Sequence, residues 1–306
     1  MAQTKITSAE VALRAGVSRS AVSRVFTVGA SASKRTVEKV RLAAQELGYR
    51  PNILARAMVS GRSRMIGLVV AYLDNQFYPE TLEKLSNALQ EKGYHVLVFM
   101  AGKDSQSIDG VIDEILDYQV DGIIAASVAL SSDLSNRCRA AGVPMVLFNR
   151  DQDDPLMSSV TSDNIAGGRK VAEFFLAAGH QKIGYIAGWE GASTQRDRES
   201  GFLARLSEEG LALHVRGVGN FRMDSAREAA LKMFSRDPPD AVFVANDHMA
   251  IAVMDTLRYE LGIKVSRDVS VVGYDDVPAI AWPAYNLTTV RQLSNIMELE
   301  TVEILL

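Results

Sequence analysis

The chain has 306 residues, of which 47% are hydrophobic and 23% charged, a composition typical of a soluble globular protein with two or three domains. Its one cysteine, Cys138, excludes an internal disulfide framework and fits a reducing compartment. The sequence has no apolar run long enough to span a membrane and no secretory signal. We therefore expect a cytoplasmic protein, associated with the nucleoid if it binds DNA, with no membrane partner.

The net charge of −4 conceals a separation of charge along the chain. Residues 1–64 hold twelve lysines and arginines against Glu10, Glu38 and Glu46, a net charge of +9, so the remaining residues carry −13. A basic head on an acidic body predicts a polyanionic partner for the head alone, and nucleic acid fits that description. The alternative is an ordinary charged and solvated surface.

Two short helices are predicted between Ile6 and Phe26. Thr7 and Glu10 form a capping-box signature before an apolar helical repeat, and Gly16 can take the left-handed conformation that a tight turn needs. Ser18 can then cap a second helix, and two helices joined in this way form a helix-turn-helix. Its outward side chains are sized to reach base edges and phosphates, and they are Arg19, Ser20, Ser23 and Arg24. The alternative is a helical hairpin with a solvated face.

A third helix is expected from Ser33 to Leu47, which Gly48 ends, so that residues 1–50 form a three-helix DNA-binding domain. Residues 51–64 form a linker whose short segment from Ile53 to Ser60 is too short to be a stable helix alone. Within that linker Met58, beside the small Ala55, can act as an apolar wedge in a minor groove. A passive hinge with Met58 packed on the next domain is the equal alternative.

From Met65 onward, strands alternate with helices, which predicts two doubly wound parallel-sheet lobes. Ligands of such sheets bind beyond the carboxyl ends of the strands, here in a cleft between the lobes. The first series has strands at 65–73, 95–100, 122–126 and 144–148, with helices at about 77–92, 106–118 and 131–141. The second series is expected to begin at 157–161, with helices at 166–178, 195–209, 224–235 and 247–261 and strands at 182–187, 213–218, 241–245 and 269–272.

Polar and aromatic side chains stand just after these strands, as hydroxyl-rich ligands require. Many of them could instead cap the next helix. They include Asp74, Asn75, Phe77, Tyr78, Ser127, Asn149, Arg150, Asp151, Asp163, Asn164, Trp189, Arg196, Arg198, Phe221, Asn246, Asp247, Tyr274, Asp275 and Asp276.

Along the chain stand the motifs EVALRAGVSRSAVSRVF, ELGYRPNILARAMVSGR, DGII at 121–124, FNRD at 148–151, SDN and GG within 162–168, IGYIAG at 183–188, RESGF at 198–202, ANDHMAIAVM at 245–254, VSVVGYDD at 269–276 and LTTVRQ at 287–292. Through these motifs the chain resembles, over essentially its whole length, the LacI/GalR family of bacterial transcription repressors.

This resemblance implies a fold of class α plus α/β, with a helix-turn-helix domain, a hinge helix and a core at 65–306 like that of a periplasmic binding protein. It also implies a homodimer on double-stranded operator DNA. The candidate DNA contacts are Thr7, Ser18, Arg19, Ser20, Ser23, Arg24, Asn52, Ala55 and Met58. The candidate effector contacts are Asn75, Phe77, Arg150, Asp163, Arg198, Phe221, Asn246 and Asp275.

The sequence departs from the family pattern at several positions. Met58 stands where the family usually has leucine, Gln76 where it often has proline, and Leu293 where proline usually comes after the VRQ motif. The chain stops at Leu306, inside an expected helix from Ser294, where the family continues with a strand and a tail. We therefore expect either a fragment or a C-terminal lobe that closes differently, with lower stability of that lobe and no tetramerisation helix.

We therefore interpret the chain as an effector-controlled transcription regulator, most simply a repressor. A periplasmic-type solute-binding protein is the alternative, although the basic head and the missing signal peptide disfavour it. An enzyme is not expected, since no nucleophile–base constellation or metal-ligand spacing is visible, and no cofactor or metal is expected. For the effector, a sugar or sugar acid is favoured. Arg150 and Arg198 suit an acid, whereas Asp163 and Asp275 suit neutral hydroxyls.

Overall fold

The computed structural model describes residues 6–27, 30–51, 61–71, 73–101, 105–126, 128, 132–152, 154 and 156–306. The chain divides into two compact units, Met1–Arg64 and Met65–Leu306. The linker residues Asn52, Ala55 and Met58 lie outside the described ranges, and so does Ser127.

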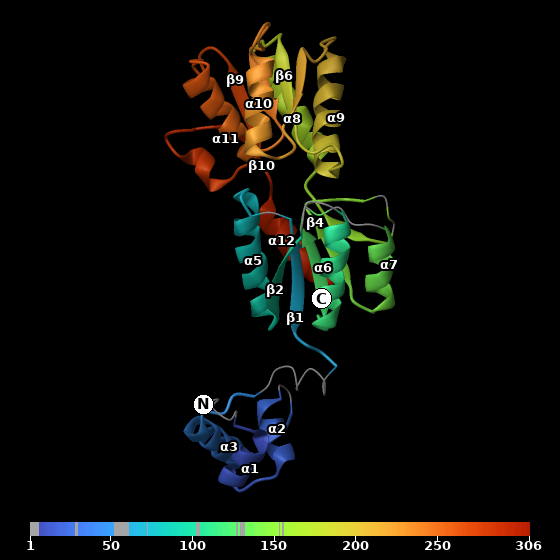
Figure 1. Cartoon of the computed structure of the whole chain (residues 1–306), viewed down its shortest axis with the longest axis vertical. Coiled ribbons are helices and arrows are strands. Elements are labelled where there is room, and N and C mark those ends of the chain that lie inside the picture. The colour runs from blue at the N-terminus through green and yellow to red at the C-terminus, as the bar shows by residue number, and fades with distance from the viewer. Residues whose placement is uncertain are drawn as a thin grey trace. The chain divides into compact units, whose positions relative to one another are not determined.

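The N-terminal unit contains the three expected helices, α1 (Ser8–Ala15), α2 (Arg19–Phe26) and α3 (Lys34–Leu47) (Figure 1). The caps form as the sequence predicts. Thr7 and Glu10 close a capping box, Ser18 accepts a hydrogen bond from the Ala21 N–H, and Gly16 ends α1 at φ 64°. Side chains from all three helices meet in a small core, and these are Val11, Ala12, Ala15, Val22, Val40, Ala43 and Ala44.

Lobe 1 of the second unit is a five-stranded parallel sheet in the order β2-β1-β3-β4-β5. Its strands are β1 (Met65–Val70), β2 (His95–Met100), β3 (Gly122–Ala126), β4 (Met145–Phe148) and β5 (Ser158–Val160). Its helices are α5 (Phe77–Glu91), α6 (Ser105–Asp117) and α7 (Ser132–Ala140). Alternate residues of β1 face opposite sides, so that Leu68 belongs to the same buried cluster as Leu85 of α5, and Val69 to the same cluster as Ile115 of α6.

Lobe 2 is a second five-stranded parallel sheet, in the order β10-β9-β8-β6-β7. Its strands are β6 (Ile183–Ala187), β7 (Val215–Val218), β8 (Ala241–Val244), β9 (Ser270–Asp275) and β10 (Thr288–Arg291). Its helices are α8 (Asn164–Ala177), α9 (Ser193–Glu208), α10 (Met223–Met233) and α11 (Asp247–Asp255), and the π-turn η1 (Thr256–Glu260) and the 3-10 turn η2 (Pro278–Ala281) come after them. The strand β10 was not predicted, because its four half-exposed residues carry no clear apolar pattern.

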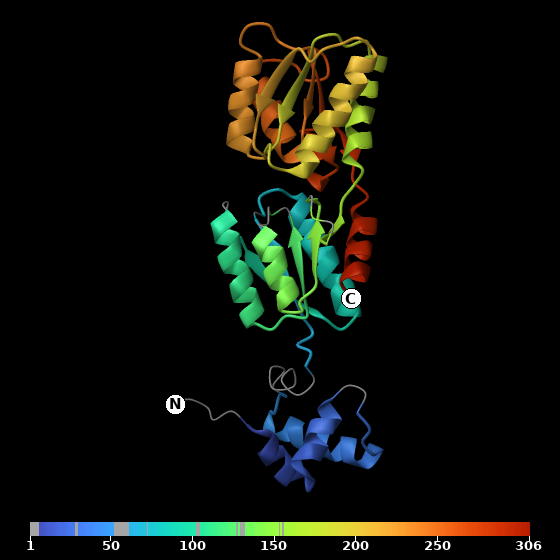
Figure 2. The same ribbon diagram turned by 90° about the vertical axis from the view of Figure 1, so that its right-hand side faces the viewer.

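Two expectations about the lobes are corrected. The second series does not begin at Met157, since β5 pairs with β4 through Val146 and Ser158 and so completes the sheet of lobe 1. The final helix α12 (Ser294–Leu305) packs on α5, β4 and β5 of lobe 1, rather than closing the C-terminal lobe (Figures 1 and 2). The chain therefore crosses between the lobes twice, after β5 and after β10.

Glycines allow α8 and α9 to pack backbone against backbone. A Cβ on Gly168 would overlap the carbonyl oxygen of Arg198, and a Cβ on Gly201 would overlap that of Ile165. This close approach brings the start of α9, which carries Arg198, up to the start of α8.

Candidate functional site

The exposed face of α2 carries cations that have no anionic partner among the described residues. Arg19, Ser20, Ser23 and Arg24 are all exposed, and within the described ranges neither guanidinium pairs with a carboxylate. By contrast, Arg14 on α1 forms an ion pair of 2.6 Å with Glu46. The hydroxyls of Thr7 and Ser18 cap the two helices, accepting from Glu10 N at 3.4 Å and Ala21 N at 3.2 Å. The face therefore presents free positive charge together with hydroxyl groups.

Within the second unit, a polar cavity lies between the lobes at the carboxyl ends of their strands. Residues of both lobes line it, and these are Asn75, Tyr78, Asn149, Arg150, Thr194, Arg198, Phe221, Asn246 and Asp275. Polar side chains from two lobes converge here, and convergent polar groups in a cleft between lobes mark a candidate ligand site.

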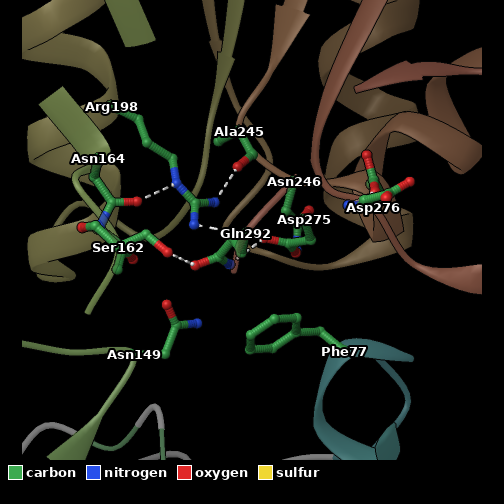
Figure 3. A network of polar contacts seen from close by, with 12 residues as sticks. Phe77, Asn149, Ser162, Asn164, Arg198, Ala245, Asn246, Asp275, Asp276 and Gln292 are labelled. Atoms are coloured by element: carbon green, nitrogen blue, oxygen red, sulfur yellow. Dashed lines mark hydrogen bonds and ion pairs between the residues drawn. The ribbon is translucent and has the colours of Figure 1, made fainter. Parts of the chain in front are cut away.

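Arg198 is the centre of the polar network in Figure 3. Its Nε donates to Asn164 Oδ1 at 2.8 Å, its Nη1 donates to the carbonyl oxygen of Ala245 at 2.6 Å, and its Nη2 lies 3.5 Å from Asp275 Oδ1. The guanidinium also stacks 3.7 Å above the centroid of the Tyr274 ring. These contacts hold the guanidinium in one position, because each of its three nitrogens has a partner.

Asp275 links this network to the two crossovers. Gln292, just after β10, donates from Nε2 to Asp275 Oδ1 at 2.7 Å, and its Oε1 accepts from the Ser162 hydroxyl at 2.8 Å. Ser162 lies in the first crossover and Gln292 in the second, so one side chain ties both to the cavity. Burial raises the pKa of Asp275 to about 6, although the charge of Arg198 opposes the rise.

Asp247, the first residue of α11, supports the turn behind the cavity. Its Oδ2 accepts from the backbone N–H groups of Asp276 at 2.7 Å and Val277 at 3.1 Å, and its Oδ1 accepts from the Thr289 hydroxyl at 2.6 Å. Asp275 and Asp276 need this support because their φ angles are 124° and 65°. Burial, reinforced by the charge of Asp275, raises the pKa of Asp247 to about 7.

Arg150 reaches the cavity from the end of β4 with fewer partners. Its Nη1 donates to the hydroxyl of Thr194, and its guanidinium lies 5.5 Å from the centroid of the Phe221 ring. The residue is 5% exposed, and its Nε has no hydrogen-bond partner among the described residues. The neighbouring Asn149 also has a buried polar atom without a hydrogen-bond partner among the described residues, its Oδ1. Its Nδ2 donates to Tyr78 Oη at 3.4 Å.

The structure brings together six of the eight predicted effector contacts, namely Asn75, Arg150, Arg198, Phe221, Asn246 and Asp275. Asp163 is not among the lining residues, because it is exposed and caps α8 by accepting from Ala166 N at 2.9 Å. Phe77 lines a neighbouring groove instead and stacks on Phe148, with 6.3 Å between ring centroids.

Three lining residues were missing from the predicted set. Tyr78 and Asn149 stand directly beside chosen residues, so the signal after each strand had already marked them. Thr194 carried no such signal, because it reaches the cavity from the first turn of α9 through the folding of lobe 2.

Nothing in the described ranges favours catalysis in this cavity. No group of three or more His, Cys, Asp or Glu side chains is placed there to hold a metal ion. A Ser-His-Asp arrangement does exist, with His180 Nδ1 3.2 Å from Asp240 Oδ1 and Nε2 2.9 Å from Ser270 Oγ. However, these residues lie at the amino ends of strands in lobe 2 and none of them lines the cavity, so they tie neighbouring strands together. As for membranes, no helix within the described residues has the length and apolarity to cross one.

Comparison with known proteins assigns both units to one family. Residues 7–52 match the family described as bacterial regulatory proteins, lacI family, and residues 63–294 match the periplasmic binding proteins and sugar binding domain of LacI family. The chain belongs to the LacI family. Its relatives include the probable HTH-type transcriptional repressor ExuR of Bacillus subtilis, 30% identical over 300 residues, which cover 94% of this chain and 86% of ExuR.

Solved structures of relatives agree with this assignment of the LacI-family chain. The lac repressor dimer bound to operator and the anti-inducer ONPF matches with a TM-score of 0.88 and 28% identity, covering 99% of this chain and 92% of that one. The complex of the transcriptional regulator CelR with cellobiose matches with a TM-score of 0.72 and 32% identity, covering 98% and 92%. The predicted family and fold class are thus confirmed.

Proposed function

We propose that this LacI-family chain is a sequence-specific transcription repressor whose affinity for operator DNA is controlled by a small effector in the interlobe cavity. The observation that carries the proposal is a pair of exposed arginines on the second helix of a capped helix-turn-helix, which no carboxylate in the described part of the chain neutralises. Such a helix docks in the major groove, where arginine reads guanine and hydroxyls reach bases and phosphates.

In this proposal Arg19, Ser20 and Arg24 read base edges, while Thr7, Ser18 and Ser23 contact the backbone. Residues 1–50 act as the DNA-binding domain, 51–64 as the hinge and 65–306 as the effector-binding core. Asn52, Ala55 and Met58 belong to the hinge contact with DNA. We also propose a homodimer, by analogy with the lac repressor dimer on its operator. The proposed site of action is the cytoplasm, where the bacterial chromosome is, and no catalytic activity is assigned.

The effector proposal rests on the cavity. Its amide, hydroxyl, guanidinium and carboxylate groups come from both lobes, so a bound ligand with several hydroxyl groups contacts both and favours their closure. The relative CelR has been solved with cellobiose, and a sugar or sugar acid fits the same chemistry here. An effector that prefers one lobe arrangement changes the affinity of the protein for operator DNA. Because the coupling between two sites is reciprocal, operator DNA changes the affinity for the effector by the same factor.

The test of DNA binding uses the full chain and a selection of bound fragments from genomic DNA, after which fluorescence anisotropy is measured on the selected site. Arg24→Ala should weaken specific binding by about 1–3 kcal/mol, or roughly 5- to 150-fold, and reduce the dependence on salt. The matched control is Arg14→Ala, which removes a cation already paired with Glu46 and should leave affinity within about twofold. Equal losses in both variants, or no selected sequence at low salt, would refute the reading of the α2 face.

A further inference from the structure

The charges that line the cavity do not balance. Two guanidinium groups, of Arg150 and Arg198, face one carboxylate, that of Asp275. A net positive charge in a buried cavity is costly unless an anion compensates it. Since the proposed function places an effector in this cavity, and the inference rests on that function, the effector itself is the expected source of the anion.

The carboxylate of Asp275 is already committed to the protein. Its Oδ1 lies 3.5 Å from Arg198 Nη2 and accepts from Gln292 Nε2 at 2.7 Å. Arg198 is equally committed, since Asn164 and Ala245 take its remaining donors. This pair is therefore a built element of lobe 2, and it neither needs nor offers a free charge.

Arg150 is left as the unbalanced cation. Among the described residues its only hydrogen-bond partner is the neutral hydroxyl of Thr194, and its Nε is buried without a partner. Its guanidinium lies over the Phe221 ring, and the charge of Asp275 acts on it without forming an ion pair. Three other carboxylates that follow strands are engaged elsewhere. Asp151 is exposed and accepts from the Ser159 hydroxyl at 2.8 Å, Asp163 caps α8, and Asp276 pairs with Arg291. Within the described part of the chain, no acidic side chain forms an ion pair with Arg150.

The polar groups around Arg150 can form hydrogen bonds with hydroxyl groups of a ligand whose negative charge pairs with Arg150. The Oδ1 of Asn149 is a buried acceptor without a donor in the described structure, and Asn75, Tyr78 and Asn246 add amide and hydroxyl groups. The Phe221 ring offers an apolar face beside these polar groups. The lining therefore fits a molecule that carries hydroxyl groups and one negative charge.

We propose that the effector is a sugar acid whose carboxylate pairs with Arg150. A carboxylate is preferred to a phosphate monoester because its single charge matches the single excess positive charge of the cavity, whereas a phosphate carries nearly two negative charges at neutral pH. A guanidinium fork also matches a carboxylate in a bidentate geometry, and the free Nε supplies one edge of that fork.

The test is calorimetric titration of the full-length chain at pH 7.5 with three groups of ligands. These are the acids D-galacturonate, D-glucuronate and D-gluconate, the neutral sugars D-galactose and D-glucose, and D-glucose 6-phosphate. At least one acid should bind, and it should bind at least about tenfold more tightly than its neutral parent, as expected for a charge-assisted hydrogen bond. A neutral sugar or the phosphate binding as tightly as the best acid would overturn the proposal, and so would the absence of binding by every acid.

A variant pair separates charge recognition from folding. Arg150→Gln should reduce the preference for the acid over its neutral parent by about tenfold or more, while the neutral sugar binds unchanged. Arg196→Gln, which alters an exposed arginine on α9 outside the cavity lining, should keep the wild-type preference. An Arg150→Gln protein that is folded by circular dichroism and keeps the full preference would refute the proposal. Operator binding, measured separately without ligand, tests the proposed function, so the two can fail independently.

Discussion

Glu298 of α12 should make the stability of lobe 1 depend on pH. The residue is 3% exposed, and its Oε1 is buried without a hydrogen-bond partner among the described residues. Burial raises the pKa of its carboxyl to about 7, with Lys84 opposing the rise and Glu80 adding to it. In the unfolded chain the same carboxyl titrates near 4.5. The folded protein therefore holds a proton that the unfolded chain has lost, and its stability falls as pH rises from about 4.5 to about 7.

The size of the effect can be worked from the shift. Each pKa unit corresponds to about 1.36 kcal/mol, so the full shift would lower the free energy of unfolding by about 2.5 kcal/mol between pH 5 and pH 8. We expect about 2 kcal/mol, because the groove beside Glu80, Thr81 and Lys84 is open to water that screens the charge. Glu298→Gln keeps the shape of the side chain and removes the titration, so this contribution should vanish.

The assay is urea unfolding, monitored by circular dichroism at pH 5 and pH 8. Wild type should lose about 2 kcal/mol more than Glu298→Gln over this range. Glu300→Gln, which changes an exposed carboxylate on the same helix, should behave like wild type. Identical pH dependence in wild type and Glu298→Gln would show that the carboxyl is ionised in the folded protein, and the argument from burial would be wrong.

Three further substitutions and one control test other parts of the structure by thermal or urea unfolding. Gly201→Ala places a Cβ against the backbone of α8 and should lower the free energy of unfolding by about 1–3 kcal/mol. Gly110→Ala, in a helix with open space around the glycine, should raise it by about 0.5–1 kcal/mol. Equal effects of the two substitutions would contradict the close packing of α8 and α9. Thr7→Ala removes the capping box and should cost the N-terminal unit about 1 kcal/mol, and no loss would show that the cap is redundant. Arg198→Met leaves Asp275 buried without its cation and should cost about 3–5 kcal/mol, and a loss below about 1 kcal/mol would mean that the carboxyl accepts a proton instead.

The N-terminal unit was predictable because its signals are local. Thr7 with Glu10, Gly16 and Ser18 each act within four residues, and each forms the cap or turn that its spacing predicts. The alternation of strands and helices was equally readable. Since the carboxyl ends of parallel strands lie on one edge of a sheet, the residues just after each strand include most of the cavity lining. These inferences needed no knowledge of distant contacts.

The remainder depends on contacts between distant segments. The strand β5 has three residues, and only its pairing with β4 assigns it to lobe 1. Whether a polar residue caps a helix or faces the cavity is decided by the helix start, so that Asp163 became the cap and Asn164 the partner of Arg198. Likewise, the sequence does not show that Arg150 lacks an anionic partner among the described residues. That depends on the fold, which leaves Asp163 out of the cavity lining and pairs Asp275 with Arg198.

The packing of α12 on α5 has a consequence for the order of assembly during synthesis. Lobe 2 is continuous in sequence from α8 to β10, so a chain emerging from a ribosome can complete it early. Lobe 1 cannot finish until residues 294–305 have emerged, about 200 positions after the helix that they cover, as the bounds of α5 and α12 show. Until then Leu85, Leu89 and the inner face of the first sheet lack part of their cover, and a nascent chain paused in that interval is exposed to aggregation or to holdase chaperones.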